Sequence, residues 1–170
     1  MQNILSNNKV IVQDNKLKSQ LIQKGFGEKT STDFVLDLVE ALYLMQKQKM
    51  EIVDSKNKKV GEKELLALGE KKLKEFYNIF LVYSDLRERG YVAKTGFRFG
   101  FHLRVYPKGK KQGEAHSQWV VNVSTQNEKL GMISLSRMVR LSGNIKTTLL
   151  QAVVDSENDI NYYSLERVTP

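Results

Sequence analysis

The sequence predicts an α/β (α+β) fold with two domains. A small N-terminal α/β domain is expected over residues 1–75, and a C-terminal mixed-sheet domain with packed helices over residues 76–170. In the first half, helical spacing of apolar residues alternates with short β-branched runs. In the second half, runs that alternate apolar and polar residues dominate. The chain has 170 residues, of which 41% are hydrophobic, so two small domains can each bury a core.

The first half is interpreted as scaffold, because no recognisable catalytic constellation occurs in it. Two short apolar runs predict strands, Lys9–Gln13 and Met50–Val53, and Leu17–Gln23 predicts a helix that ends before a glycine. A longer helix is predicted after Ser31–Asp33, whose residue types favour N-caps. Its core-facing side chains would be Val35, Leu38, Val39, Leu42 and Met45.

The second half is predicted to be a sheet with one packed helix. A long helical stretch, Glu62–Leu86, leads into it, and Gly69 marks the point at which that helix would break. Ser124–Gly131 is expected to be a loop and Ser134–Asn144 a helix. The expected strands are Tyr91–Lys94, Phe97–Tyr106, a strand along which Trp119, Val121 and Val123 alternate, Lys146–Asp155 and Ile160–Val168.

The stretch Gly96–Val121 carries the clearest pattern, which predicts a strand, a polar loop and a second strand. Its apolar residues, expected to face a core, alternate with polar ones and are Phe97, Phe99, Phe101, Leu103 and Val105. The opposite face would then present His102, Arg104 and Tyr106. His116 is expected to open the next strand.

The charge of the chain favours a polyanionic partner. Lys and Arg total 27 against 19 Asp and Glu, a formal net charge of +8. The excess concentrates between Arg87 and Lys111, where Glu88 is the only acid and aromatic residues are interleaved with the basic ones. Such interleaving suits phosphate contact and base stacking, although the alternating Phe residues are expected to belong to the core. A solubilising surface is the alternative interpretation of the charge.

Other functional classes are disfavoured by composition. Cysteine is absent, which excludes disulfides and thiolate metal sites. No apolar run approaches the ~20 residues that a membrane-spanning helix needs, so we expect no membrane association and a cytoplasmic protein. We expect neither a metal nor another cofactor.

Several segments together resemble the archaeal tRNA-intron splicing endonuclease family. The first-half match is Asp33–Met45 (DFVLDLVEALYLM). The second-half matches are VYSDLRERGYVAK from Val82, TGFRFGFHLRVY from Thr95, EAHSQWVVNV from Glu114 and AVVDSENDINYY from Ala152. The combination of LRxRGY, KTGxxFG, a strand ending in Tyr and the dipeptide His-Ser is specific. The resemblance covers nearly the whole chain and implies an N-terminal domain and a C-terminal nuclease domain.

The resemblance implies a reaction and its residues. Members of this family cut precursor tRNA at a bulge-helix-bulge without a metal, leaving a 2′,3′-cyclic phosphate and a 5′-hydroxyl. Tyr106 matches the family's tyrosine, the expected base, and His116 matches its histidine, the expected acid. The family's third group is a lysine, and here the chain departs from the pattern. An ungapped alignment puts Thr147 at that position and Lys146 one place before it. We assign the role to Lys146, which a bulge or turn would have to re-aim.

The resemblance also implies RNA contacts and an assembly. Arg140 and Tyr162 match positions that hold a flipped bulge base. Chains of this length act as homodimers that form homotetramers, or with a paralogous subunit. The closing strand is the expected dimer edge, and the expected inter-subunit loop, Ser124–Gly131, has Glu128 as its only acid.

Two other functions are compared with this one on the same residues. A non-catalytic structural subunit that positions precursor tRNA for a partner is the alternative, because threonine cannot supply a positive charge. A metal-dependent nuclease is disfavoured, because Asp155, Glu157 and Asp159 read as a turn rather than as strand-borne metal ligands.

Overall fold

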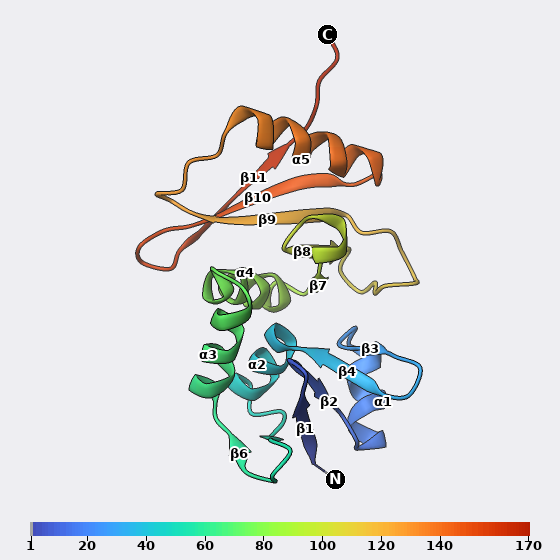
Figure 1. The fold of residues 1–170 in the computed structure, drawn as a ribbon. Helices are drawn as coiled ribbons and strands as arrows, with labels where there is room; N and C mark the ends of the chain where they lie inside the picture. The colour runs from blue at the N-terminus through green and yellow to red at the C-terminus, as the bar shows by residue number, and fades with distance from the viewer. Residues whose placement is uncertain (1) are drawn as a thin grey trace. The chain divides into compact units, whose positions relative to one another are not determined.

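The computed structural model describes residues 2–170. The chain divides into two units, one up to Phe80 and one from Leu81 onward, and each is described by itself. The two units contain a mixed sheet each, accompanied by helices, which confirms the predicted α+β class (Figure 1). The predicted boundary at residues 75 and 76 stays a prediction.

The N-terminal unit is built on a sheet in which, over the described residues, six short strands are ordered β3-β4-β2-β1-β5-β6. β1 pairs antiparallel with β2 and parallel with β5, so the sheet is mixed. The predicted strand at Lys9–Gln13 is confirmed as β2. The strand bounds are β1 Asn3–Ser6, β2 Lys9–Ile11, β3 Glu28–Lys29, β4 Phe34–Asp37, β5 Ile52–Val53 and β6 Lys59–Val60.

The helix predicted after Ser31–Asp33 starts later than expected. Phe34–Asp37 is strand β4, and helix α2 covers Leu38–Gln46. The N-cap is Asp37 rather than Ser31–Asp33, because Glu40 completes a capping box with it. Glu40 is almost fully buried, and its carboxylate accepts the backbone N–H groups of Gly27 and Asp37 at 3.0 and 3.1 Å.

Three further helices lie between or after these strands along the chain. The predicted helix at Leu17–Gln23 is confirmed as α1, Asn15–Gln23. The long helical stretch is two helices, α3 Glu62–Lys72 and α4 Phe76–Glu88. The break falls after Lys72, not at Gly69, and Glu75 adopts a positive φ of 67° there. Gly69 is needed for close packing, since a Cβ on it would lie 2.3 Å from the Phe76 ring.

The C-terminal unit is built on a five-stranded sheet, counted over the described residues, in the order β11-β10-β9-β8-β7. β10 runs parallel to β9, whereas the other neighbouring pairs are antiparallel. The sheet is therefore mixed, as predicted. Its strands are β7 Val92–Thr95, β8 Leu103–Tyr106, β9 Trp119–Thr125, β10 Thr148–Val154 and β11 Ile160–Leu165.

The strand predicted from Phe97 is wrong over its first half. Phe97–Phe99 forms a 3-10 turn, with Phe97 49% and Phe99 37% exposed. The turn forms because Gly100 takes a left-handed φ of 77°, and because Gly96 packs against the backbone of Leu103. Only Phe101, Leu103 and Val105 follow the predicted burial, whereas Tyr106, expected on the opposite face, is buried as well.

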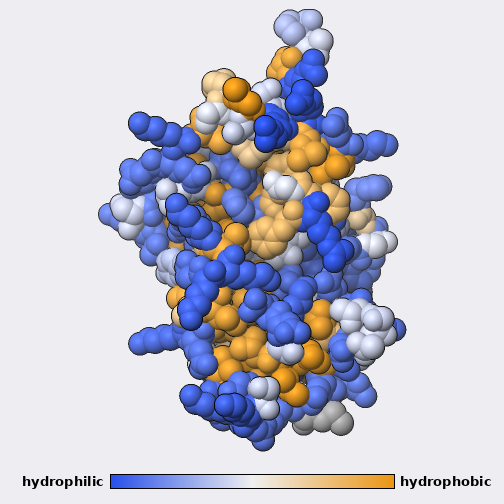
Figure 2. Space-filling view, in the orientation of Figure 1, coloured by the Kyte–Doolittle hydropathy of each residue, from blue (hydrophilic) through white to orange (hydrophobic). Residues whose placement is uncertain are grey.

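Helix α5, Met132–Asn144, covers one face of the C-terminal sheet (Figure 1). Its apolar residues pack on a buried cluster of Phe101, Val120 and Leu149. Two predictions about neighbouring segments are wrong: β9 begins at Trp119, three residues after His116, and β10 begins at Thr148, two after Lys146. On the face shown in Figure 2, hydrophilic side chains cover most of the surface, with apolar patches between them.

Candidate active site

One end of the C-terminal sheet collects the three residues expected to be catalytic. Val105 pairs with Trp119, and Trp119 pairs with Thr148. The end of β8 and the starts of β9 and β10 therefore lie at the same end of the sheet. Gln118 ties these strands together. Its N–H donates to the carbonyl of Val105 at 2.7 Å, and its carbonyl accepts from the N–H of Thr148 at 3.4 Å. Tyr106 ends β8, and the other two candidates precede β9 and β10 by a few residues.

Tyr106 is held rigidly at this end. It pairs with Val92 of β7, and only 3% of its surface is exposed. Burial raises the pKa of the Tyr106 phenol, and the nearby charge of Arg104 acts in the opposite direction. A tyrosine that is to act as a base must lose its proton, so the balance of these two effects sets how much tyrosinate is present.

His116 and Lys146 are less constrained than Tyr106. His116 is exposed in the loop that precedes β9. Lys146 is also exposed, in the turn after α5, with a left-handed φ of 56°. Thr147, at the position that the resemblance gives to lysine, donates its hydroxyl to the carbonyl of Ser142 at 3.3 Å. The turn therefore separates Lys146 from the strand, whose predicted start was Lys146 itself.

Arg140 and Tyr162 are not brought together in the chain. Arg140 is exposed on α5, the helix that packs against the sheet face carrying Leu149. Tyr162 faces the opposite side, where its hydroxyl donates to Asp85 Oδ2 of α4 at 2.7 Å. Arg89 pairs with the same oxygen and lies 5.9 Å from the Tyr162 ring. Burial, and then the contact with Asp85, raises the pKa of Tyr162.

The residues expected to mediate assembly lie at exposed places. Glu128 is exposed in the loop between β9 and α5, close in sequence to the exposed apolar residues Leu130, Met132 and Ile133. β11 is an edge strand that pairs with β10 on one side only within residues 2–170. Its free edge carries unpaired backbone groups.

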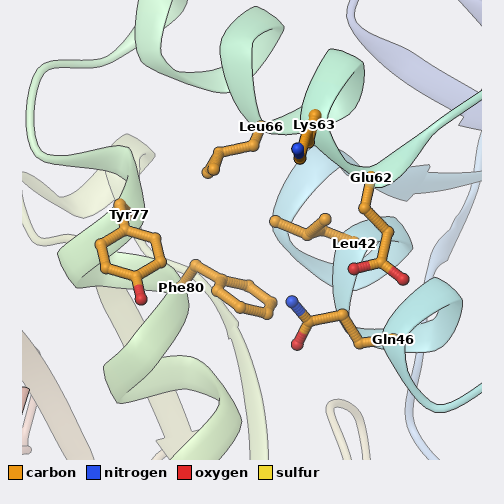
Figure 3. Close-up of a pocket in the computed structure, with 7 residues that line it drawn as sticks. All are labelled: Leu42, Gln46, Glu62, Lys63, Leu66, Tyr77 and Phe80. Atoms are coloured by element: carbon orange, nitrogen blue, oxygen red, sulfur yellow. The ribbon is translucent and has the colours of Figure 1, made fainter.

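A cavity in the N-terminal unit lies apart from the predicted site residues. This cavity of about 110 Å³ is surrounded by the apolar side chains of Leu42, Leu66 and Phe80, with Gln46 and Glu62 beside it (Figure 3). None of the predicted site residues lines it. Within residues 2–170, His, Asp and Glu side chains do not gather in threes as a metal site would require. The same residues include no helix long and apolar enough to cross a bilayer.

Arg104 is the residue that sequence reasoning placed near the site without giving it a role. Its guanidinium carbon lies 4.4 Å from the centre of the Phe99 ring and 5.8 Å from that of Tyr106. The spacing of two residues from Tyr106 was the available signal, because it puts both side chains on one face of a strand.

The fold and charge define a two-unit α+β protein in which Tyr106 ends a strand of the C-terminal sheet, with His116 in the loop before β9 and Lys146 in the turn before β10. A family model described as the catalytic C-terminal domain of tRNA intron endonucleases matches residues 76–162. A second, described as the N-terminal domain of tRNA intron endonucleases, matches residues 1–66.

Archaeal relatives match along nearly the whole chain. A tRNA-splicing endonuclease of Thermococcus onnurineus is 36% identical over 165 residues, covering 96% of this chain and 94% of that protein. One of Pyrococcus furiosus is 37% identical over 168 residues, with 95% and 93% covered. One of Methanothermobacter thermautotrophicus is 35% identical over 145 residues, with 85% and 84% covered. The chain belongs to the tRNA intron endonuclease family.

Proposed function

We propose that this chain is a tRNA-splicing endonuclease that cleaves precursor tRNA at bulge-helix-bulge splice sites. The reaction is a metal-free transesterification that leaves a 2′,3′-cyclic phosphate and a 5′-hydroxyl. The observation that carries the proposal is the meeting of three strand ends, so that Tyr106 and the segments holding His116 and Lys146 share one end of the sheet. Membership of the family and the names of its archaeal relatives support the same substrate.

The mechanism follows from what the reaction needs. The tyrosinate of Tyr106 takes the proton of the 2′-hydroxyl, whose oxygen attacks the adjacent phosphorus. As the bond from phosphorus to the 5′-oxygen breaks, protonated His116 gives that oxygen its proton. A cation stabilises the additional negative charge on the five-coordinate phosphate. Lys146 keeps this third role in the proposal, because it is the cation next to the position that the family fills with lysine.

The alternative function, a non-catalytic subunit that positions RNA for a partner chain, also rests on a specific observation. Thr147 is neutral and its hydroxyl is occupied by the Ser142 carbonyl. Lys146 lies outside the strand in an exposed turn. A partner chain would then supply the complete set of catalytic groups.

RNA binding and assembly complete the proposal. Exposed Arg140 contacts RNA, and the ring of Tyr162 stacks on a base, from opposite faces of the sheet. Two copies pair through the free edge of β11, or this chain pairs with a paralogous subunit, and the loop carrying Glu128 contacts a further subunit. Native mass spectrometry of the purified chain tests this assembly. A monomer at micromolar concentration contradicts self-association.

The deciding experiment is cleavage of an end-labelled bulge-helix-bulge RNA by this chain alone in EDTA, with the product ends identified. Cyclic phosphate and 5′-hydroxyl ends are expected. A strict requirement for Mg²⁺ contradicts the mechanism. No cleavage by this chain alone, with activity restored by a second chain, favours the supporting-subunit function.

A further inference from the structure

Arg104 is a fixed positive charge beside the proposed base. It lies two residues before Tyr106 in β8, on the same face of the strand. Its guanidinium is stacked at 4.4 Å from the centre of the Phe99 ring and lies 5.8 Å from that of Tyr106. Strand pairing fixes the backbone, since Arg104 pairs with Lys94 on one side and with Val120 on the other. The pairing places the backbone of Arg104, and the contacts with the Phe99 and Tyr106 rings place its guanidinium.

Among the described residues, no acidic side chain is paired with this charge. No carboxylate among residues 2–170 forms an ion pair with Arg104, and its Nε is buried without a hydrogen-bond partner in the same part of the chain. A guanidinium held only by ring contacts keeps its full attraction for an anion. Surface arginines that serve solubility are instead hydrated or paired. The arrangement fits a phosphate that approaches Tyr106.

The other candidate cation is held differently. Lys146 is exposed in a left-handed turn, and Thr147 has no charge to contribute. A flexible, solvated ammonium stabilises a transition state less than a charge that is already in position, because the latter needs no reorganisation when the reaction occurs. Among the residues expected to act here, Arg104 combines a permanent charge with a fixed position on the strand of the base.

We propose that Arg104 is a catalytic residue of this site and contacts the reacting phosphate. This inference rests on the proposed function. The guanidinium donates to a non-bridging oxygen of the phosphate while the 2′-oxygen bonds to phosphorus and the bond to the 5′-oxygen breaks. Arg104 itself neither gains nor loses a proton. The proton of the 2′-hydroxyl goes to Tyr106, and that of His116 goes to the leaving oxygen.

A second effect of the same charge concerns Tyr106. The charge of Arg104 lowers the pKa of the phenol that burial raises. Removing the charge should therefore raise the pKa of Tyr106 and move the alkaline rise of the pH–rate profile to higher pH. A residue that only supports the fold would change the rate without this displacement.

The test compares Arg104→Gln and Arg104→Lys with Lys146→Gln, and uses Arg98→Gln as a control that removes an exposed arginine from the neighbouring turn. Single-turnover cleavage is measured across pH. Affinity is measured with RNA carrying a 2′-deoxy nucleotide at the splice site, which cannot cyclise. Circular dichroism shows whether each variant is folded.

We expect Arg104→Gln to lose at least ~10²-fold in rate, while affinity for the uncleavable RNA changes by less than ~5-fold. Arg104→Lys should recover part of the rate, and Arg98→Gln should stay near the wild type. A rate for Arg104→Gln within ~3-fold of the wild type overturns the inference, as does a loss confined to affinity. A larger loss in Lys146→Gln than in Arg104→Gln also overturns it.

Failure of the inference is distinguishable from failure of the proposed function. If the wild-type chain makes no cyclic phosphate, alone or with a partner chain, the proposed function fails. Absorbance titration of the tyrosines, with Tyr106→Phe subtracted, then decides the remaining point. An unchanged Tyr106 titration in Arg104→Gln overturns the electrostatic coupling, whereas an upward shift supports it.

Discussion

Replacing Tyr162 with Phe tests whether this tyrosine stabilises the C-terminal unit. The substitution keeps the ring but removes the hydroxyl that donates to Asp85 at 2.7 Å. A hydrogen bond to a charged group contributes ~1.5–3 kcal/mol. Because Asp85 keeps Arg89 on the same oxygen, at 2.7 Å, we expect a loss near the lower end, about 1–2 kcal/mol of unfolding free energy at pH 8.

The pH dependence of this loss has a defined sign. The pKa of Tyr162 is raised in the folded chain above its ordinary value of 10.0, because burial and the contact with Asp85 favour the neutral phenol. Its contribution is therefore fully present below pH 10 and is lost as the pH rises, since the unfolded chain ionises first. The difference between Tyr162→Phe and the wild type should shrink between pH 8 and pH 11.

Urea unfolding followed by the fluorescence of Trp119 measures this loss. Trp119 is the only tryptophan and lies in the C-terminal unit, so the signal reports that unit. Protein concentration is held constant, because self-association would shift the transition. Tyr163→Phe is the control, since Tyr163 is 55% exposed on the same strand. A difference below ~0.3 kcal/mol at pH 8, or one that does not shrink at pH 11, would refute the reasoning.

Three further predictions concern stability and catalysis. Gly96→Ala should cost about 1–3 kcal/mol in the same urea assay, because its Cβ would lie 2.9 Å from backbone that cannot yield, and an unchanged midpoint would contradict this. Glu40→Ala should cost about 2–4 kcal/mol by circular dichroism, since two backbone N–H groups lose their acceptor, with a smaller loss expected for Glu40→Gln. His116→Ala should lose at least ~10²-fold in single-turnover cleavage with RNA affinity nearly unchanged, and a near-wild-type rate would remove it from the mechanism.

Local patterns let the sequence predict much of the fold. The alternation of Trp119, Val121 and Val123 identified β9, although its predicted start at His116 was three residues early. Helical spacing identified α5 to within two residues of its start. These predictions succeed because an apolar face repeats with the period of its own element. The family motifs likewise named Tyr106 and His116, because the residues around each of them are part of the pattern.

Errors arose where a short segment had two locally acceptable states. Phe97–Phe99 alternates like a strand, but Gly96 and Gly100 permit a turn that leaves two rings exposed. Ser31–Asp33 has the residue types of a good N-cap, but Phe34–Asp37 pairs with β2 and β3 as a strand. The helix therefore begins only after Asp37. The flanking glycines decided the first case, and pairing with distant strands decided the second.

By itself the sequence determined the α+β class, the order of most elements, the basic character of the chain and its family motifs. Each of these depends only on the pattern of neighbouring residues or on composition. Tertiary structure alone decided that Tyr106 is buried beside the Arg104 charge, that Lys146 lies in a turn outside β10, and that Tyr162 is bound to Asp85. Tyr162 and Asp85 are 77 positions apart in the chain. Contacts over such separations depend on how strands pair and helices pack, and no local pattern encodes that.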